Sequence, residues 1–144
     1  GAALSGVNDR TLLELSQFGI PLGLAFQLRD DVLGVFGDPS VTGKPAGDDL
    51  REGKRTVLVG LTLESVPESV SKIFNELLMA GEIEDEQLDF MRRTITDSGA
   101  LSKTERMIEE HSVRAIEALS NLEVTDQARK MLSVLTEKVI NRQS

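Results

Sequence analysis

Apolar residues recur at helical spacing along almost the whole chain, and this periodicity constrains its fold more than any other feature. Few segments alternate polar and apolar residues as a strand does. The first apolar run predicts one long helix that ends near Gly34. It contains Leu12, Leu13, Leu15, Phe18, Leu22, Ala25, Phe26 and Leu33. A helix that is apolar around most of its circumference usually lies at the centre of a bundle, so we predict an all-α fold.

A stretch rich in glycine and proline, residues 34–55, interrupts the helical periodicity and is dense in charge. Ordered loops of this length are usually functional. Helical spacing returns at Val57, and a second helix is expected from the Ser65–Glu68 capping-box pattern to Gly81. Further helices are predicted at about 84–97, at 101–121 and from about residue 125 onward.

Composition restricts the classes of protein to which the chain can belong. The 144 residues contain no cysteine, which excludes disulfides and thiolate metal sites, and no segment resembles a linker between two domains. Sixteen basic against twenty-four acidic residues give a net charge of −8, which argues against nucleic acid as the partner. No apolar run reaches the ~20 residues that span a bilayer, so we expect a soluble, cytoplasmic protein.

Two adjacent carboxylates, Asp30 and Asp31, are expected in the last turn of the first helix. Negative charge near a helix C-terminus is unfavourable by about 0.3–1 kcal/mol per group, so the pair needs a compensating cation. Gln27 precedes them by three and four residues and therefore shares their helical face. Carboxylate and amide oxygens suit Mg²⁺, which also takes ligands from water and substrate phosphates.

The loop that follows supplies cations, because Lys44 and Lys54 flank a second acidic pair, Asp48 and Asp49. Acidic pairs and cations at this spacing are the parts of a metal–diphosphate clamp. Two alternatives to a binding site remain open at this point: Asp30 and Asp31 could be a solvated helix end, and the loop could be a surface loop held by salt bridges.

Several motifs together resemble the second aspartate-rich region of the trans-isoprenyl (polyprenyl) diphosphate synthases, most closely the bacterial geranylgeranyl and longer-chain members. They are FQLRDDVL at 26–33, FGDP at 36–39, TGKP at 42–45, GDDL at 47–50 and REGKRT at 51–56, with SGAL at 98–101 downstream. The resemblance implies the C-terminal half of an all-α isoprenoid-synthase bundle.

The same resemblance implies a prenyltransferase that condenses an allylic diphosphate with isopentenyl diphosphate, using Mg²⁺ to assist loss of diphosphate. Asp30 and Asp31 are then metal ligands, and Gln27 orients the site. Lys44 and Lys54 bind the allylic diphosphate, with Asp30 and Lys44 the expected catalytic residues. Asp48 is expected to partner a lysine or a metal-bound water. A homodimer is also implied.

Two departures from the family pattern bear on activity. The pattern Asp-Asp-x-x-Asp has Gly34 at its last position here, and the first aspartate-rich motif is absent. We therefore expect residues 1–144 to be the C-terminal portion of a synthase domain, inactive alone. Its apolar surface at residues 11–33 is expected to drive association. A non-catalytic partner or regulatory subunit of a synthase is the alternative, and a terpene cyclase fits less well. Product chain length stays open.

Overall fold

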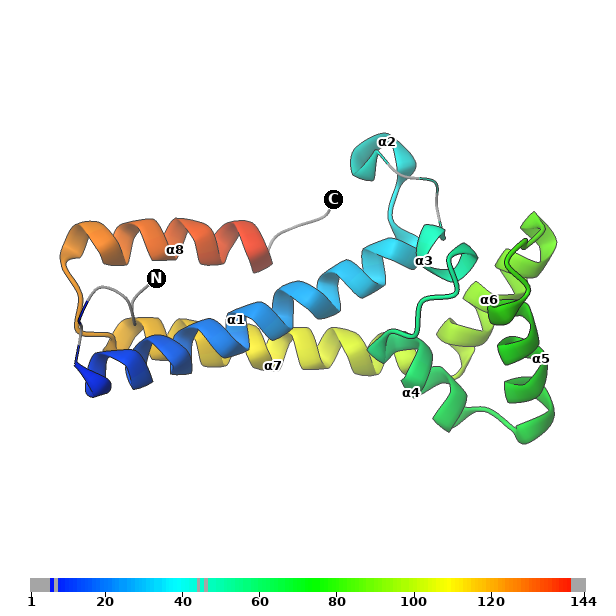
Figure 1. Cartoon of the computed structure of the whole chain (residues 1–144), viewed down its shortest axis with the longest axis horizontal. Coiled ribbons are helices and arrows are strands. Elements are labelled where there is room, and N and C mark those ends of the chain that lie inside the picture. The colour runs from blue at the N-terminus through cyan, green and yellow to red at the C-terminus, as the bar shows by residue number, and fades with distance from the viewer. Residues whose placement is uncertain (1–5, 7, 44, 46, 141–144) are drawn as a thin grey trace. The chain divides into compact units, whose positions relative to one another are not determined.

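The computed structural model describes residues 6, 8–43, 45 and 47–140, and within these ranges every regular element is a helix (Figure 1). The all-α prediction is therefore confirmed. The elements are α1 (Asp9–Phe36), α2 (Pro39–Thr42), α3 (Asp48–Arg51), α4 (Val57–Ser65), α5 (Glu68–Met79), α6 (Asp85–Asp97), α7 (Ala100–Asn121) and α8 (Asp126–Ile140). In the parts of the chain described, no helix is both long and apolar enough to cross a bilayer.

The helices divide between two compact units, and α1 and α7 contribute to both. The first unit, unit 1, contains the described residues up to Gln27 and those from Met107 onward. The second unit, unit 2, contains Leu28–Arg106. The acidic pair of α1 and the glycine-rich stretch that follows it therefore belong to the same unit.

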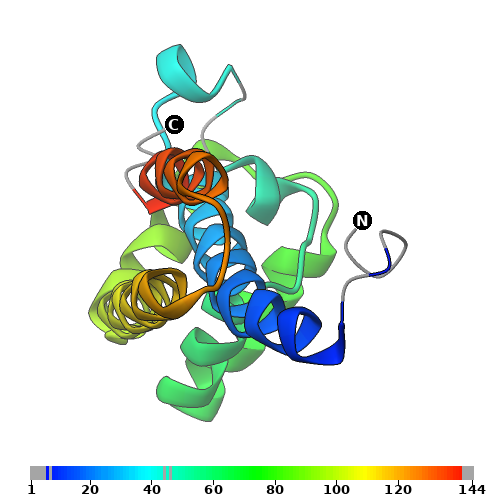
Figure 2. The same ribbon diagram turned by 90° about the vertical axis from the view of Figure 1, so that its left-hand side faces the viewer.

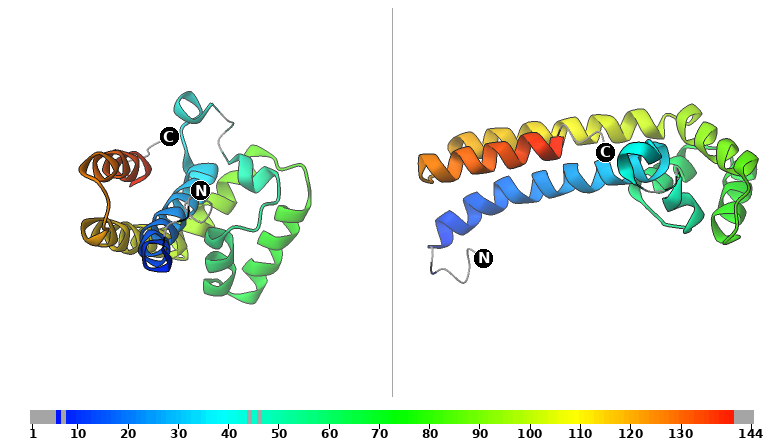
Figure 3. Two further views of the ribbon diagram at one scale, coloured as in Figure 1. Left: turned by 60° about the vertical axis from the view of Figure 1, so that its left-hand side comes forward. Right: turned by 90° about the horizontal axis from the view of Figure 1, so that it is seen from above.

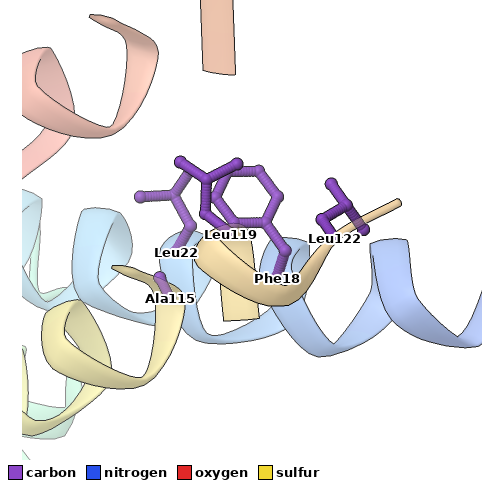
Figure 4. Close-up of a cluster of buried hydrophobic side chains, with 5 residues drawn as sticks. All are labelled: Phe18, Leu22, Ala115, Leu119 and Leu122. Atoms are coloured by element: carbon purple, nitrogen blue, oxygen red, sulfur yellow. The ribbon is translucent and has the colours of Figure 1, made fainter. Parts of the chain in front are cut away.

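Unit 1 is built on one buried apolar cluster. Phe18 and Leu22 from α1 pack against Ala115, Leu119 and Leu122, as Figure 4 shows. Partly buried side chains that cover this cluster are Leu15, Ala118, Val124, Leu132 and Val139. The chain turns back at residues 122–125, so α7 and α8 run in opposite directions (Figure 2).

Arg129 stabilises this turn by binding backbone carbonyls at the end of α7. Its guanidinium donates to the carbonyl oxygens of Leu119 (2.5 Å), Ser120 (3.1 Å) and Leu122 (2.6 Å). The last carbonyls of a helix lack partners within the helix, and a cation there also interacts favourably with the helix dipole. Arg129 therefore closes α7 and fixes the start of α8.

Unit 2 contains α2 to α6, with α4 in contact with both α5 and α6. The two short helices α2 and α3 lie in the connection between α1 and α4 (Figure 3). Thr56 begins α4 as its N-cap, since its hydroxyl accepts the amide of Val59 (3.3 Å). Among the buried apolar side chains of this unit are Val32, Val35, Leu50, Leu58, Val59, Phe74, Leu78, Met91 and Ile95.

Helix α1 ends at Phe36, close to the predicted end near Gly34, and Arg92 binds its C-terminal end through the carbonyl of Val35 (2.9 Å). One local prediction was wrong. The capping box predicted at Ser65 and Glu68 is absent, because Ser65 closes α4 and its hydroxyl donates to the carbonyl of Leu61 (2.7 Å).

Candidate functional site

The acidic pair lies on α1 about one and a half turns before the helix ends at Phe36. Asp30 is half-buried, whereas only 4% of Asp31 is exposed. The Asp31 carboxylate accepts a hydrogen bond from the amide of Val57 (3.3 Å), the first residue of α4. A carboxylate is favourable at a helix N-terminus, where amides lack intrahelical partners. Asp31 therefore joins α1 to α4. If Asp31 also binds a metal ion, it must do so while one of its carboxylate oxygens accepts this hydrogen bond.

Gly34 lies four residues after Asp30, on the same face of α1, and it forms a seat for Asp49. A Cβ added at Gly34 would meet Cγ and Oδ2 of Asp49 at less than 3.0 Å, closer than real Cβ atoms come to other atoms. The Asp49 carboxylate thus lies against the backbone of α1, and a side chain at position 34 would displace it.

Lys54 pairs with this same carboxylate. Its Nζ atom lies 2.6 Å from Asp49 Oδ1 and 2.7 Å from Glu52 Oε2. The hydrogen bond to Asp49, and after it the one to Glu52, raise the pKa of Lys54 above its ordinary value, so the side chain is held as an ammonium. The acidic face of α1 and the cation of the following loop are therefore linked through Asp49.

The backbone of the loop is fixed by contacts with α5 and α6. Gly53 has a φ of +67°, and a Cβ there would lie 2.7 Å from the carbonyl oxygen of Leu78. Arg51 forms an ion pair with Asp85 (2.6 Å) and donates to the carbonyl oxygen of Ile83. These contacts hold α3 and Lys54 in a defined position within unit 2.

Of the residues predicted from sequence, Asp30, Asp31, Asp48 and Lys54 fall in unit 2. Asp48 makes no ion pair or side-chain hydrogen bond to another described residue. The carboxylate partners of Lys54 are Asp49 and Glu52, which the sequence reasoning did not assign to the site. The short spacing between Asp49 and Lys54 in the sequence indicated that the two could pair, but Asp48 is only one residue further away, so the spacing did not show which aspartate pairs with Lys54. A role for Asp48 beside a metal-bound water stays a prediction.

The remaining two predicted residues are Lys44 and Gln27. Lys44, the predicted catalytic and diphosphate-binding lysine, lies outside the described residues. Gln27 is exposed on α1, three residues before Asp30, and belongs to unit 1. Its orienting role stays a prediction.

The donor set suits an ion that completes its coordination from outside the protein. Within the described ranges, no three His, Cys, Asp or Glu residues come together so as to hold a metal ion. Asp30 and the neighbouring carboxylates fit Mg²⁺, which is commonly bound by one or two carboxylates with water and substrate phosphates. Because Gly34 has no side chain, the Asp49 carboxylate lies on the same face of α1 as Asp30.

Comparison with known proteins gives consistent matches. The family model described as polyprenyl synthetase matches residues 1–95. The geranylfarnesyl diphosphate synthase of Aeropyrum pernix is 35% identical over 143 residues, which cover 99% of this chain and 44% of that protein. The geranylgeranyl diphosphate synthase of Saccharolobus solfataricus is 36% identical over 146 residues, covering 98% of this chain and 44% of that protein.

Solved structures agree with the sequence matches. The geranylgeranyl pyrophosphate synthase of Corynebacterium glutamicum, crystallised with isoprenyl diphosphate and magnesium, aligns with a TM-score of 0.87 at 35% identity. That alignment covers 99% of this chain and 40% of the enzyme. The polyprenyl synthetase of Streptomyces coelicolor A3(2) aligns with a TM-score of 0.85 at 31% identity, covering 96% of this chain and 43% of that one. The chain thus spans less than half the length of these relatives, and it belongs to the polyprenyl synthetase family.

Proposed function

We propose that this chain forms the diphosphate-ionising part of a trans-prenyltransferase, which condenses an allylic diphosphate with isopentenyl diphosphate. One observation carries the proposal: the Asp49 carboxylate sits on α1 one turn beyond Asp30 and holds the Lys54 ammonium at 2.6 Å. An acidic face for a cation and a cation for a phosphate therefore meet in one compact unit. The names of the relatives support the reaction class.

Each predicted residue has a task in this reaction. Asp30, with Asp31 beside it, would hold Mg²⁺, which neutralises the charge that develops on the departing diphosphate. Lys44 and Lys54 would bind the phosphate oxygens directly through charge-assisted hydrogen bonds. Gln27 would orient the acidic face, and Asp48 would bind a lysine or an ordered water.

The reaction needs charge stabilisation more than acid–base chemistry. The allylic carbon–oxygen bond breaks heterolytically, and the electron pair leaves with the diphosphate. The double bond of isopentenyl diphosphate then attacks the allylic cation to form a carbon–carbon bond, and loss of one proton restores a double bond. Fixed cations at the leaving group lower the barrier because they are oriented before charge develops there.

The 144-residue chain is expected to bind the metal diphosphate but not to elongate a prenyl chain alone, because it spans 44% of its relatives. The native assembly is proposed to be a homodimer. A non-catalytic partner subunit is the second candidate, and the same partial coverage is the observation that favours it.

The test begins with the intact mass of the purified protein, followed by calorimetric titration with geranyl diphosphate in the presence and absence of Mg²⁺. Prenyl transfer from added isopentenyl diphosphate is then measured. Mg²⁺-dependent binding that is lost in Lys54→Gln supports the site. Absence of Mg²⁺-dependent binding by the wild-type chain would refute it. Turnover by a 15.7 kDa species would refute the expectation of inactivity and, with it, the partner-subunit candidate.

A further inference from the structure

We infer that Asp49 takes the place on α1 that a side chain at position 34 would fill, and that it positions the Lys54 ammonium beside Asp30. This inference rests on the proposed function, because it assigns Lys54 to the diphosphate. Asp49 acts through Lys54 and is a positioning residue rather than a catalytic one.

The steric evidence comes from Gly34. Residues 30 and 34 are four apart on one helix, so their side-chain positions are about 5–6 Å apart. The Asp49 carboxylate lies within 3.0 Å of the point where a side chain at position 34 would begin. The helix face of Asp30 therefore carries a second carboxylate, which comes from α3 and not from α1 itself.

The charge evidence comes from the exposure of the partners of Lys54. Only 14% of the Asp49 side chain is exposed, against 51% for Glu52. An ion pair with an exposed carboxylate orders a lysine weakly, since solvent screens it and both side chains stay mobile. Asp49 is further anchored by its fit against Gly34, and its own carbonyl accepts the amide of Lys54 (2.9 Å). Asp49 therefore fixes where the ammonium lies.

Asp48 offers a matched control, because it is the neighbouring carboxylate on the same helix. Asp48→Asn and Asp49→Asn remove the same charge, and neither changes the size of the side chain. If these carboxylates acted only by adding negative charge near an anion site, both substitutions would raise the affinity for pyrophosphate. If Asp49 positions Lys54, its substitution lowers that affinity although a repelling charge has been removed.

The first experiment measures binding of inorganic pyrophosphate with Mg²⁺ by calorimetry to the wild type, both Asn variants, Lys54→Gln and the two double variants that combine Lys54→Gln with each Asn substitution. We expect Asp49→Asn to weaken binding by about tenfold, the loss of one charge-assisted contact. In the Lys54→Gln background, Asp49→Asn should have no further effect. The effect of Asp48→Asn should instead be the same with and without Lys54, because the carboxylates that pair with Lys54 are Asp49 and Glu52. Equal coupling of the two Asn variants to Lys54, or an undiminished Asp49→Asn effect without Lys54, would overturn the inference.

The second experiment disturbs the contact between Asp49 and Gly34. A methyl group at position 34 would overlap the Asp49 carboxylate, so Gly34→Ala should weaken pyrophosphate binding by shifting that carboxylate. In an Asp49→Ala background, Gly34→Ala should have no effect on binding. An effect of Gly34→Ala that is equally large with and without Asp49 would contradict the inference.

A third measurement separates this inference from the proposed function. The side-chain ammonium signal of Lys54 in NMR spectra, assigned with Lys54→Gln, should persist in the wild type and in Asp48→Asn but exchange away in Asp49→Asn. If the wild type fails to bind pyrophosphate with Mg²⁺, the proposed function fails while this signal still tests the positioning. An ammonium signal unchanged by Asp49→Asn would refute the positioning whatever the binding result.

Discussion

Two glycines inside helices of unit 2 should respond differently to substitution by alanine. Gly60 lies in α4 with no atom within 4 Å of an added Cβ, whereas an added Cβ at Gly34 would overlap the Asp49 carboxylate. Both positions are helical, so both substitutions gain the same helix propensity. The difference between them therefore measures the steric cost at Gly34 alone.

The magnitude follows from two contributions. Glycine in a helix interior costs about 1 kcal/mol relative to alanine, so Gly60→Ala should stabilise unit 2 by roughly that amount. An extra methyl group in a filled site costs about 1–3 kcal/mol, and that cost is added to the same gain at Gly34. Rotation of Asp49 away from the methyl group would relieve the clash, but it would also give up the ion pair with Lys54, worth at most about 1 kcal/mol at this exposure. The cheaper route sets the cost, so we expect Gly34→Ala to be less stable than Gly60→Ala by about 1 kcal/mol.

Thermal and urea unfolding followed by far-UV circular dichroism would measure this difference, since the chain has no Trp or Tyr for fluorescence. For a chain of this size, each kcal/mol shifts the melting temperature by about 3–5 °C. In an Asp49→Ala background, the two alanine variants should agree within about 0.5 kcal/mol, because the obstructing carboxylate is gone. Equal stability of the two variants in the wild-type background would refute the assignment of Gly34 as the seat of Asp49.

Four further predictions concern other parts of the structure. Thr56→Ala should destabilise unit 2 by about 1 kcal/mol through loss of the α4 N-cap, and Thr56→Ser should retain most of it, as measured by urea unfolding. Arg129→Ala should cost about 1.5–3 kcal/mol, because three carbonyl oxygens lose a charged donor; no loss would show that water replaces it. The raised pKa of Lys54 contributes stability below its unfolded value and loses that stability as pH rises through the folded value. The melting-temperature advantage of wild type over Asp49→Asn should therefore shrink at alkaline pH, and a constant advantage would contradict this. Exposed apolar side chains on α1, such as Ile20 at 62%, should drive association, and a monomer by analytical ultracentrifugation at all concentrations would exclude it.

Helical periodicity predicted the long elements well, because their signals are local. The helix predicted at 84–97 corresponds to α6, Asp85–Asp97, and the one at 101–121 to α7, Ala100–Asn121. The wrong capping box also has a local cause. Val66 precedes Pro67 and takes an extended conformation, with φ of −101° and ψ of 157°, so a helix cannot include Ser65 and Glu68 in one turn. Glu84 and Gln87 form the capping box that is present, at the start of α6.

The continuation of α1 past Gly34 to Phe36 could not be predicted from local sequence. Glycine within a helix costs only about 1 kcal/mol, so Gly34 ends the helix or is tolerated according to what surrounds it. Here the surroundings are Asp49, fifteen residues later, and Arg92, which donates to the carbonyl of Val35. These contacts join residues that are far apart in the sequence and depend on how α3 and α6 pack. No motif in the first helix predicts them.

The choice between Asp48 and Asp49 shows the same limit within the candidate site. Adjacent residues on a helix point about 100° apart, so only one of the pair can face α1. Gly47, with a φ of +77°, begins α3 and sets its rotation, and a Cβ at Gly47 would strike Leu88 of α6. The packing of α3 against α6 thereby selects Asp49 rather than Asp48 to face Gly34. A side chain at position 34 must shift the Asp49 carboxylate, so the conformation of Asp49 depends on the residue at 34 and neither position can be interpreted from its own motif alone.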